Sequence, residues 1–97
     1  MVIFIMTNAP ENLRGELTKW VMEVKAGVFV GNLSKSVRDR LWKKVVEVNV
    51  PEALMIYNYN NEQGYNIEMI GDPYRFVKDY EGLLLIGRKI RGIENAE

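Results

Sequence analysis

Residues 13–42 read LRGELTKWVMEVKAGVFVGNLSKSVRDRLW, and this stretch sets the order of the elements around it. Apolar residues recur at helical spacing on both sides of its centre. At the centre, Val28-Phe29-Val30 lies between Gly27 and Gly31 and has the short apolar pattern of a strand. The stretch therefore predicts a helix, a short strand and a second helix, in that order.

Positive charge is concentrated in and around this stretch. Eight Lys and Arg residues lie between Asn12 and Lys44 against three acidic residues, a net charge of +5. Residues 45–86 reverse the balance, with two basic and seven acidic residues and a net charge of −5. A chain that is neutral overall is thus strongly polarised along its length.

Length and composition bound the protein class. A chain of 97 residues forms one small domain, which buries only roughly 60–65% of its unfolded surface, so we expect self-association to enlarge the buried area. The absence of Cys and His excludes disulfides, thiolate and imidazole metal sites, and Ser-His or Cys-His catalysis. The first residues, MVIFIM, lack the charge of a signal peptide and the length of a membrane span, so a soluble cytoplasmic protein is expected.

The first part of the chain predicts a buried strand followed by a helix. Val2 to Met6 form a continuous apolar run, typical of a strand buried on both faces in the middle of a sheet. Asn8 is a candidate helix cap, Pro10 suits a first helical turn, and Gly27 would end the helix. Trp20 lies on the apolar stripe of this helix, so core packing is expected of it rather than base stacking. The stripe consists of Leu13, Leu17, Trp20, Val21 and Val24.

The rest of the chain predicts a second helix and three further strands. Ser34 is a candidate cap for a helix that carries apolar residues from Val37 to Val48, and Pro51 ends it. A hairpin is expected beyond Pro51, with Gly64 able to take a positive φ. The expected segments are a strand at 53–59, a loop at 60–64, a strand at 65–70, a loop or short helix at 74–81 and a strand at 83–86.

This order predicts an α+β protein with the ferredoxin-like βαββαβ fold, helices on one face of the sheet and an additional C-terminal strand. The expected domain covers residues 1–86, and residues 87–97 form a basic and then polar tail. The last strand would close its own sheet or pair with the edge of a neighbouring subunit. Many unrelated functions share this fold, so the periodicity alone does not assign one.

One run of residues is far more specific than a lone glycine motif. Residues 23–31 read EVKAGVFVG, and they occur together with Leu13-Arg14-Gly15, Trp20 and Trp42. Similar positions follow later in the chain, namely Glu62, Gly64, Gly71, Arg75 and Gly82-Leu83. From Val2 to Ile86 the chain resembles the small CRISPR-associated adaptation protein in its type I-E form.

The resemblance implies a homodimer formed through the sheets. Such a dimer would lie between dimers of the catalytic subunit of the adaptation integrase, which inserts foreign duplex DNA as new spacers. The small protein would act there as a scaffold and would bind the DNA backbone without sequence preference. By this resemblance and the charge pattern, candidate DNA contacts are Asn8, Arg14, Lys25, Arg38 and Arg75, with Arg14 and Arg75 as the principal clamps. Glu62 and Glu81 are candidate contacts to the catalytic subunit, and the alternative is that both are solvated loop acids.

The resemblance also raises a second function, that of a metal-dependent endonuclease acting on single-stranded RNA or duplex DNA. In the family this activity is attributed to a carboxylate at the end of the first strand, which would bind Mg²⁺ at the dimer interface. The matching position here is Thr7, and a neutral hydroxyl is a poor substitute. The sequence therefore predicts no catalytic residue and no metal ligand, and argues against nuclease activity.

A third class, an RNA-binding module on the same fold, has less support. Such a module would carry a glycine-rich aromatic signature on its third strand, whereas residues 54–59 read LMIYNY, without glycine or an adjacent basic residue. Tyr57 and Tyr59 could stack on bases, but the alternating pattern favours packing in the sheet.

Overall fold

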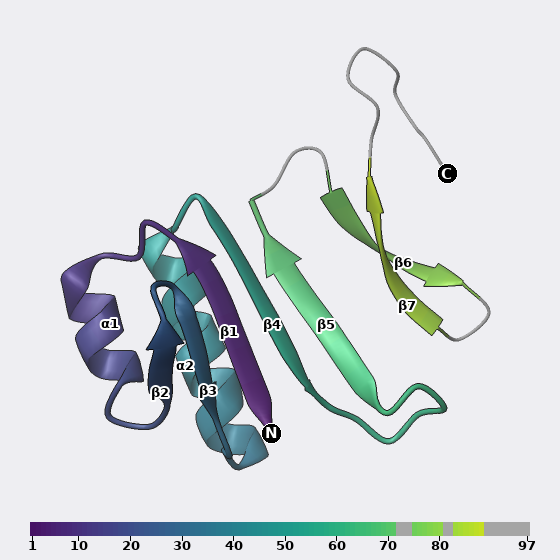
Figure 1. Ribbon diagram of the computed structural model, residues 1–97, viewed down its shortest axis with the longest axis horizontal. Coiled ribbons are helices and arrows are strands. Elements are labelled where there is room, and N and C mark those ends of the chain that lie inside the picture. The colour runs from purple at the N-terminus through teal and green to yellow at the C-terminus, as the bar shows by residue number, and fades with distance from the viewer. Residues whose placement is uncertain (72–74, 81–82, 89–97) are drawn as a thin grey trace.

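The computed structural model describes residues 1–71, 75–80 and 83–88. The elements in chain order are β1 (Val2–Thr7), α1 (Glu11–Leu17), β2 (Met22–Lys25), β3 (Val28–Gly31), α2 (Lys35–Val48), β4 (Glu52–Asn58), β5 (Tyr65–Ile70), β6 (Arg75–Tyr80) and β7 (Leu83–Arg88). Five strands form an antiparallel sheet in the order β2-β3-β1-β4-β5, and β6 and β7 form a separate hairpin (Figure 1). The first four strands and two helices have the predicted ferredoxin-like βαββαβ topology, and β5 extends the sheet at one edge.

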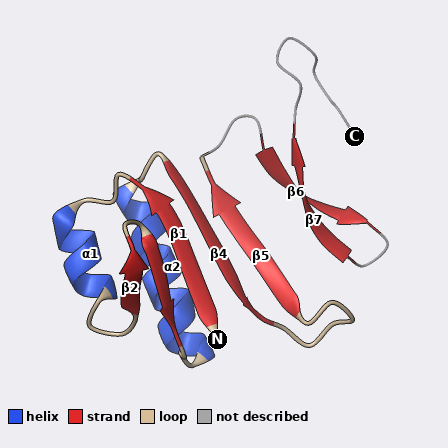
Figure 2. Cartoon of the chain, in the orientation of Figure 1, coloured by secondary structure: helices blue, strands red, loops and turns tan. Residues whose placement is uncertain are grey.

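Both helices pack on the same face of the sheet, as predicted (Figure 2). The helices contribute Leu13, Leu17, Leu41 and Val45 to a core that the sheet completes with Phe4, Phe29 and Met55, among other residues. Ser34 caps α2 as predicted, because its hydroxyl accepts a hydrogen bond from the Val37 N–H at 3.4 Å. Of the described helices, neither is long and apolar enough to cross a membrane.

The central strand β1 differs from the prediction in one respect. It lies in the middle of the sheet, but only Val2, Phe4 and Met6 are buried, whereas Ile5 on the other face is 39% exposed. The helices cover one face, and nothing in a single chain's described residues covers the other. An apolar strand thus has one face without a partner.

The predicted first helix is wrong beyond Leu17. Residues 18–21 form a turn, and Met22–Lys25 is strand β2. The two-residue turn at Ala26-Gly27 joins β2 to β3, and Gly27 has a φ of +80°, which glycine adopts without strain. Gly27 therefore closes a hairpin instead of ending a helix.

The same change moves Trp20 out of the core. Trp20 is 44% exposed, and the predicted core packing is wrong for this residue, whereas Leu13, Leu17 and Val21 are buried as expected. The predicted cap at Asn8 is also wrong. Asn8 has a left-handed backbone with a φ of 54°, and α1 follows Pro10 without a side-chain cap.

The β4–β5 hairpin has the predicted loop, with Gly64 at a φ of +86°. Where a loop or short helix was expected, Arg75–Tyr80 is strand β6, which pairs with β7. β7 confirms the predicted last strand and continues to Arg88, two residues past the expected domain boundary. The tail at 89–97 lies outside the described residues.

Candidate nucleic-acid interface

Three of the candidate DNA contacts gather around the carboxyl end of β1. Asn8 directly follows this strand, and the Met6 N–H donates a hydrogen bond of 2.9 Å to the Gly27 carbonyl. That bond holds the β2–β3 turn beside the strand end, and Lys25 is the exposed residue that enters the turn. Arg14 on α1 is connected to the same turn because it forms an ion pair with Glu23 on β2.

Glu23 on β2 forms hydrogen bonds with both α1 and the β2–β3 turn. Its Oε2 accepts hydrogen bonds from the Gly27 N–H at 3.0 Å and from Arg14 Nη2 at 2.6 Å. The Gly27 N–H first, and then the Arg14 guanidinium, hold the pKa of the Glu23 carboxyl below its ordinary value. The Arg14 side chain remains 42% exposed, so its other N–H groups can reach a phosphate.

The lowered pKa of Glu23 makes part of the folding stability depend on pH. The charged carboxylate contributes fully above its unfolded-state pKa, and the contribution disappears as the pH falls through the lowered folded-state pKa. We therefore expect Glu23→Gln to have a lower free energy of unfolding than the parent protein at pH 7. At pH 3 the difference between the two proteins should be smaller. Urea unfolding of both proteins at the two pH values measures this difference. A stability difference that is equal at both pH values would contradict it.

Arg38 lies at the other end of the sheet. Its guanidinium carbon is 3.7 Å from the centroid of the Tyr57 ring, and its side chain is only 12% exposed. Tyr57 pairs with Val2 at the start of β1, about 20 Å along the strand from Asn8 at ~3.3 Å per residue. Arg38 is thus not brought together with Asn8, Arg14 and Lys25, and its contact with DNA stays a prediction.

Tyr57 is a packed residue of the sheet. It is buried, its hydroxyl donates to Glu68 Oε2 at 3.1 Å, and it accepts from Asn66 Nδ2 at 2.8 Å. Burial, more than the neighbouring charges, raises the pKa of the Tyr57 hydroxyl and keeps it protonated. With Arg38 above the ring, Tyr57 has no free face for a base. Tyr59, by contrast, is 53% exposed.

The remaining candidates are placed only in part. Glu62 is exposed in the β4–β5 hairpin loop. Arg75 begins β6, where the structure describes the backbone path and pairing alone. Glu81 lies outside the described residues.

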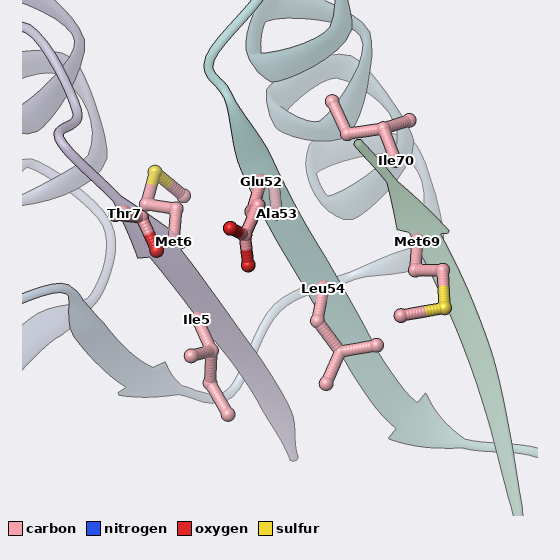
Figure 3. A pocket seen from close by; sticks show the side chains of 8 residues that line it. All are labelled: Ile5, Met6, Thr7, Glu52, Ala53, Leu54, Met69 and Ile70. Atoms are coloured by element: carbon pink, nitrogen blue, oxygen red, sulfur yellow. The ribbon is translucent and has the colours of Figure 1, made fainter. Parts of the chain in front are cut away.

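Thr7, the position matched to the family's metal-binding carboxylate, has a neighbour that the sequence did not reveal. Thr7 pairs with Glu52 on β4, and the Thr7 hydroxyl and the Glu52 carboxylate point toward each other between the strands (Figure 3). The two residues form the polar end of a shallow hollow that is otherwise lined by Ile5, Met6, Ala53, Leu54, Met69 and Ile70.

This pair does not form a magnesium site within one chain. Mg²⁺ prefers an octahedral set of oxygen ligands and usually takes one or two carboxylates with waters. Here a single carboxylate, Glu52, faces a neutral hydroxyl. In the part of the chain that the structure describes, no three His, Cys, Asp or Glu side chains are grouped to hold a metal ion.

The open face of the sheet is a feature that the apolar pattern of the strands did not predict. Ile3 on β1 pairs with Val30 on one side and Ile56 on the other, and Ile5 likewise pairs with Val28 and Leu54. We define the open face as Ile3, Ile5, Val28, Val30, Leu54, Ile56, Ile67 and Met69, the last two from β5. All eight are apolar, although an antiparallel sheet usually turns a polar face to solvent.

One comparison with known proteins bears on this chain. Residues 1–85 match the model of a family described as CRISPR-associated protein (Cas_Cas2CT1978), which covers the five-stranded sheet, both helices and the residues around the β1 end. The matched region includes the hairpin of Glu23 and Gly27 that sequence periodicity misassigned. The chain therefore belongs to this family of CRISPR-associated proteins.

Proposed function

We propose that this protein is the non-catalytic, DNA-backbone-binding scaffold of a CRISPR spacer-acquisition integrase and acts there as a homodimer. The observation that carries the proposal is the open face, which consists of eight aliphatic or thioether side chains on the uncovered side of the sheet. Burying these side chains against a second copy removes apolar surface from water at about 25 cal/mol per Å². Membership of the CRISPR-associated family supports a role in a CRISPR system.

The charges around the β1 end suit a duplex backbone. Arg14 and Lys25 are cationic and solvent-accessible, and Asn8 offers an amide at the same end. Phosphates are bound by such groups without reading the bases, so this contact has no sequence preference. A twofold axis doubles the basic residues, and the dimer presents two such clusters to one duplex. Arg75 is proposed as a further clamp.

We expect Arg14→Ala to weaken duplex binding and to flatten its dependence on salt. Two phosphate contacts are lost per dimer, so the negative slope of log K against log salt should become smaller in magnitude by about 1.8. Fluorescence anisotropy of a labelled duplex at several salt concentrations measures this slope. The double variant R14A/R75A should have a still flatter slope.

Lys35→Ala provides the matched control for Arg14→Ala. Lys35 carries the same charge and is 82% exposed, but it begins α2 at the far end of the fold. This variant should keep the parent slope. Equal slopes for Arg14→Ala and the parent protein at moderate salt would refute the assignment of Arg14.

We propose that Glu62 and Glu81 contact the catalytic subunit of the integrase, because an acidic half suits a basic partner. Glu62 is exposed on a hairpin loop, where a side chain is free to meet a second protein. Glu62→Lys should reduce co-elution with the catalytic subunit, whereas Glu62→Gln should reduce it less. Full co-elution of both variants would remove Glu62 from the interface.

The second candidate function is the metal-dependent endonuclease, and one observation favours it: the Glu52 carboxylate faces Thr7. We nevertheless expect purified protein to leave single-stranded RNA and duplex DNA intact with Mg²⁺, because the family's strand-end position is the neutral Thr7 here and the Glu52 carboxylate lies on a different strand, β4. Parallel incubations with Mg²⁺, with chelator and with Glu52→Gln test this. Cleavage that requires Mg²⁺ and is lost in Glu52→Gln would establish the nuclease.

A further inference from the structure

A second exposed feature lies on the helical side of the fold, where the turn between α1 and β2 meets α2. Trp20 in that turn is 44% exposed, although the guanidinium carbon of Arg40 lies 5.4 Å from the centroid of its ring. A large aromatic side chain usually buries more of its surface. The arrangement leaves part of the indole open to solvent beside a cation.

The surroundings of this ring are basic. Arg40 makes no ion pair with a described residue, and the same holds for Lys43, one helical turn further along α2. Lys19 precedes Trp20 in the chain and shares Glu16 with Lys44, at 3.6 and 4.0 Å. Arg40 thus lies over the exposed ring, Lys19 is its neighbour in the chain, and Lys43 follows Arg40 on α2.

We propose that Trp20 and Arg40 form a stacking platform for an unpaired base of single-stranded nucleic acid. Every base has a π-face that stacks on an indole, and the adjacent phosphates are attracted by Arg40, Lys43 and Lys19. Arg40 over one ring face keeps the indole in place, and the exposed area of Trp20 receives the base. This contact is distinct from the duplex contact at Arg14, which needs phosphates alone.

The platform is accessible in the proposed dimer. Arg40 belongs to α2, which covers one side of the sheet, and the open face lies on the opposite side. A second copy seated on the open face leaves Trp20 uncovered. A protein partner is the competing occupant, because Val24 on β2 is also exposed. The basic neighbours of the ring favour a polyanion over an apolar protein surface.

The test uses a labelled 12-nucleotide thymidine strand and a 12-base-pair duplex, with the full chain in each case. Trp20→Ala should weaken binding of the single strand by about 5- to 150-fold, the effect of losing one stacked base, and change duplex affinity by less than about twofold. Trp20→Phe, which keeps an aromatic face, should retain most of the single-strand affinity. Arg40→Gln should weaken single-strand binding and flatten its salt dependence.

Tryptophan fluorescence supplies an independent readout. The chain has two tryptophans, and the second, Trp42, is half-buried against the core. Trp42→Phe keeps an aromatic ring there and leaves Trp20 as the sole tryptophan. In that variant the single strand should quench the emission. Single-strand affinity that is unchanged in Trp20→Ala, an equal loss for strand and duplex, or no binding of the strand by the parent protein would overturn the proposal. The duplex arm with Arg14→Ala reports separately on the proposed scaffold function.

Discussion

Ile5→Glu is expected to convert the protein from a dimer into a monomer. Ile5 occupies the centre of the open face, flanked by Val28 on β3 and Leu54 on β4, and it is 39% exposed in a single chain. In the dimer the new carboxylate would be buried without a partner, which costs several kcal/mol per ion. Size-exclusion chromatography with light scattering should change from twice 11.2 kDa to a single chain mass.

Val46→Glu is the matched control for this change. Val46 is also a β-branched residue, is 45% exposed, and lies on α2 on the covered side of the sheet. The variant should remain dimeric, and both variants should keep the far-UV circular dichroism of the parent protein. A parent protein that is monomeric at working concentration, or a dimeric Ile5→Glu variant, would refute an interface on the open face.

Loss of the dimer should also weaken duplex binding. The Arg14 clusters of two chains act on one duplex only when the chains are joined, so Ile5→Glu loses the gain from linked binding. Ile5 lies two residues from the strand end that carries Asn8, but it carries no charge itself. A fall in both dimer mass and duplex affinity in this variant would connect the sheet interface to the DNA contact.

Gly27→Ala is expected to produce a large loss of stability. Gly27 has a φ of +80°, and a Cβ there would lie 2.3 Å from the Met6 carbonyl oxygen, a backbone atom that cannot turn aside. The left-handed conformation and the displacement of β1 together should cost at least about 2 kcal/mol. For a domain of this size that corresponds to a Tm lower by roughly 8 °C or more.

Gly64→Ala separates the two causes. Gly64 has a similar φ of +86°, but a Cβ there would meet no atom within 4 Å. Its substitution incurs the conformational cost alone, about 1 kcal/mol. Thermal unfolding should therefore rank the parent protein first, Gly64→Ala second and Gly27→Ala last. Equal losses for the two variants would show that the contact with Met6 contributes nothing.

Short-range patterns predicted much of the fold. The Ser34 cap, the helix that carries apolar residues from Val37 to Val48, its end before Pro51 and the β4–β5 hairpin each depend on residues a few positions apart, and each is confirmed. The same method failed at residues 18–25. There Val21 and Val24 fit a helical stripe and a strand equally well, and pairing with β3, which no local pattern contains, decided for the strand.

What the sequence determined by itself is the order of most elements, the polarised charge, the family motif and the absence of thiol or imidazole chemistry. Only the tertiary structure decided which side chains meet. It placed Glu52 opposite Thr7, Glu23 between Arg14 and Gly27, Arg40 over Trp20, and eight apolar residues on one uncovered face. Apart from the hydrogen bond between Glu23 and Gly27, these contacts join residues nine or more positions apart in the chain. Their register is set by long-range strand pairing and helix docking, which local periodicity does not encode.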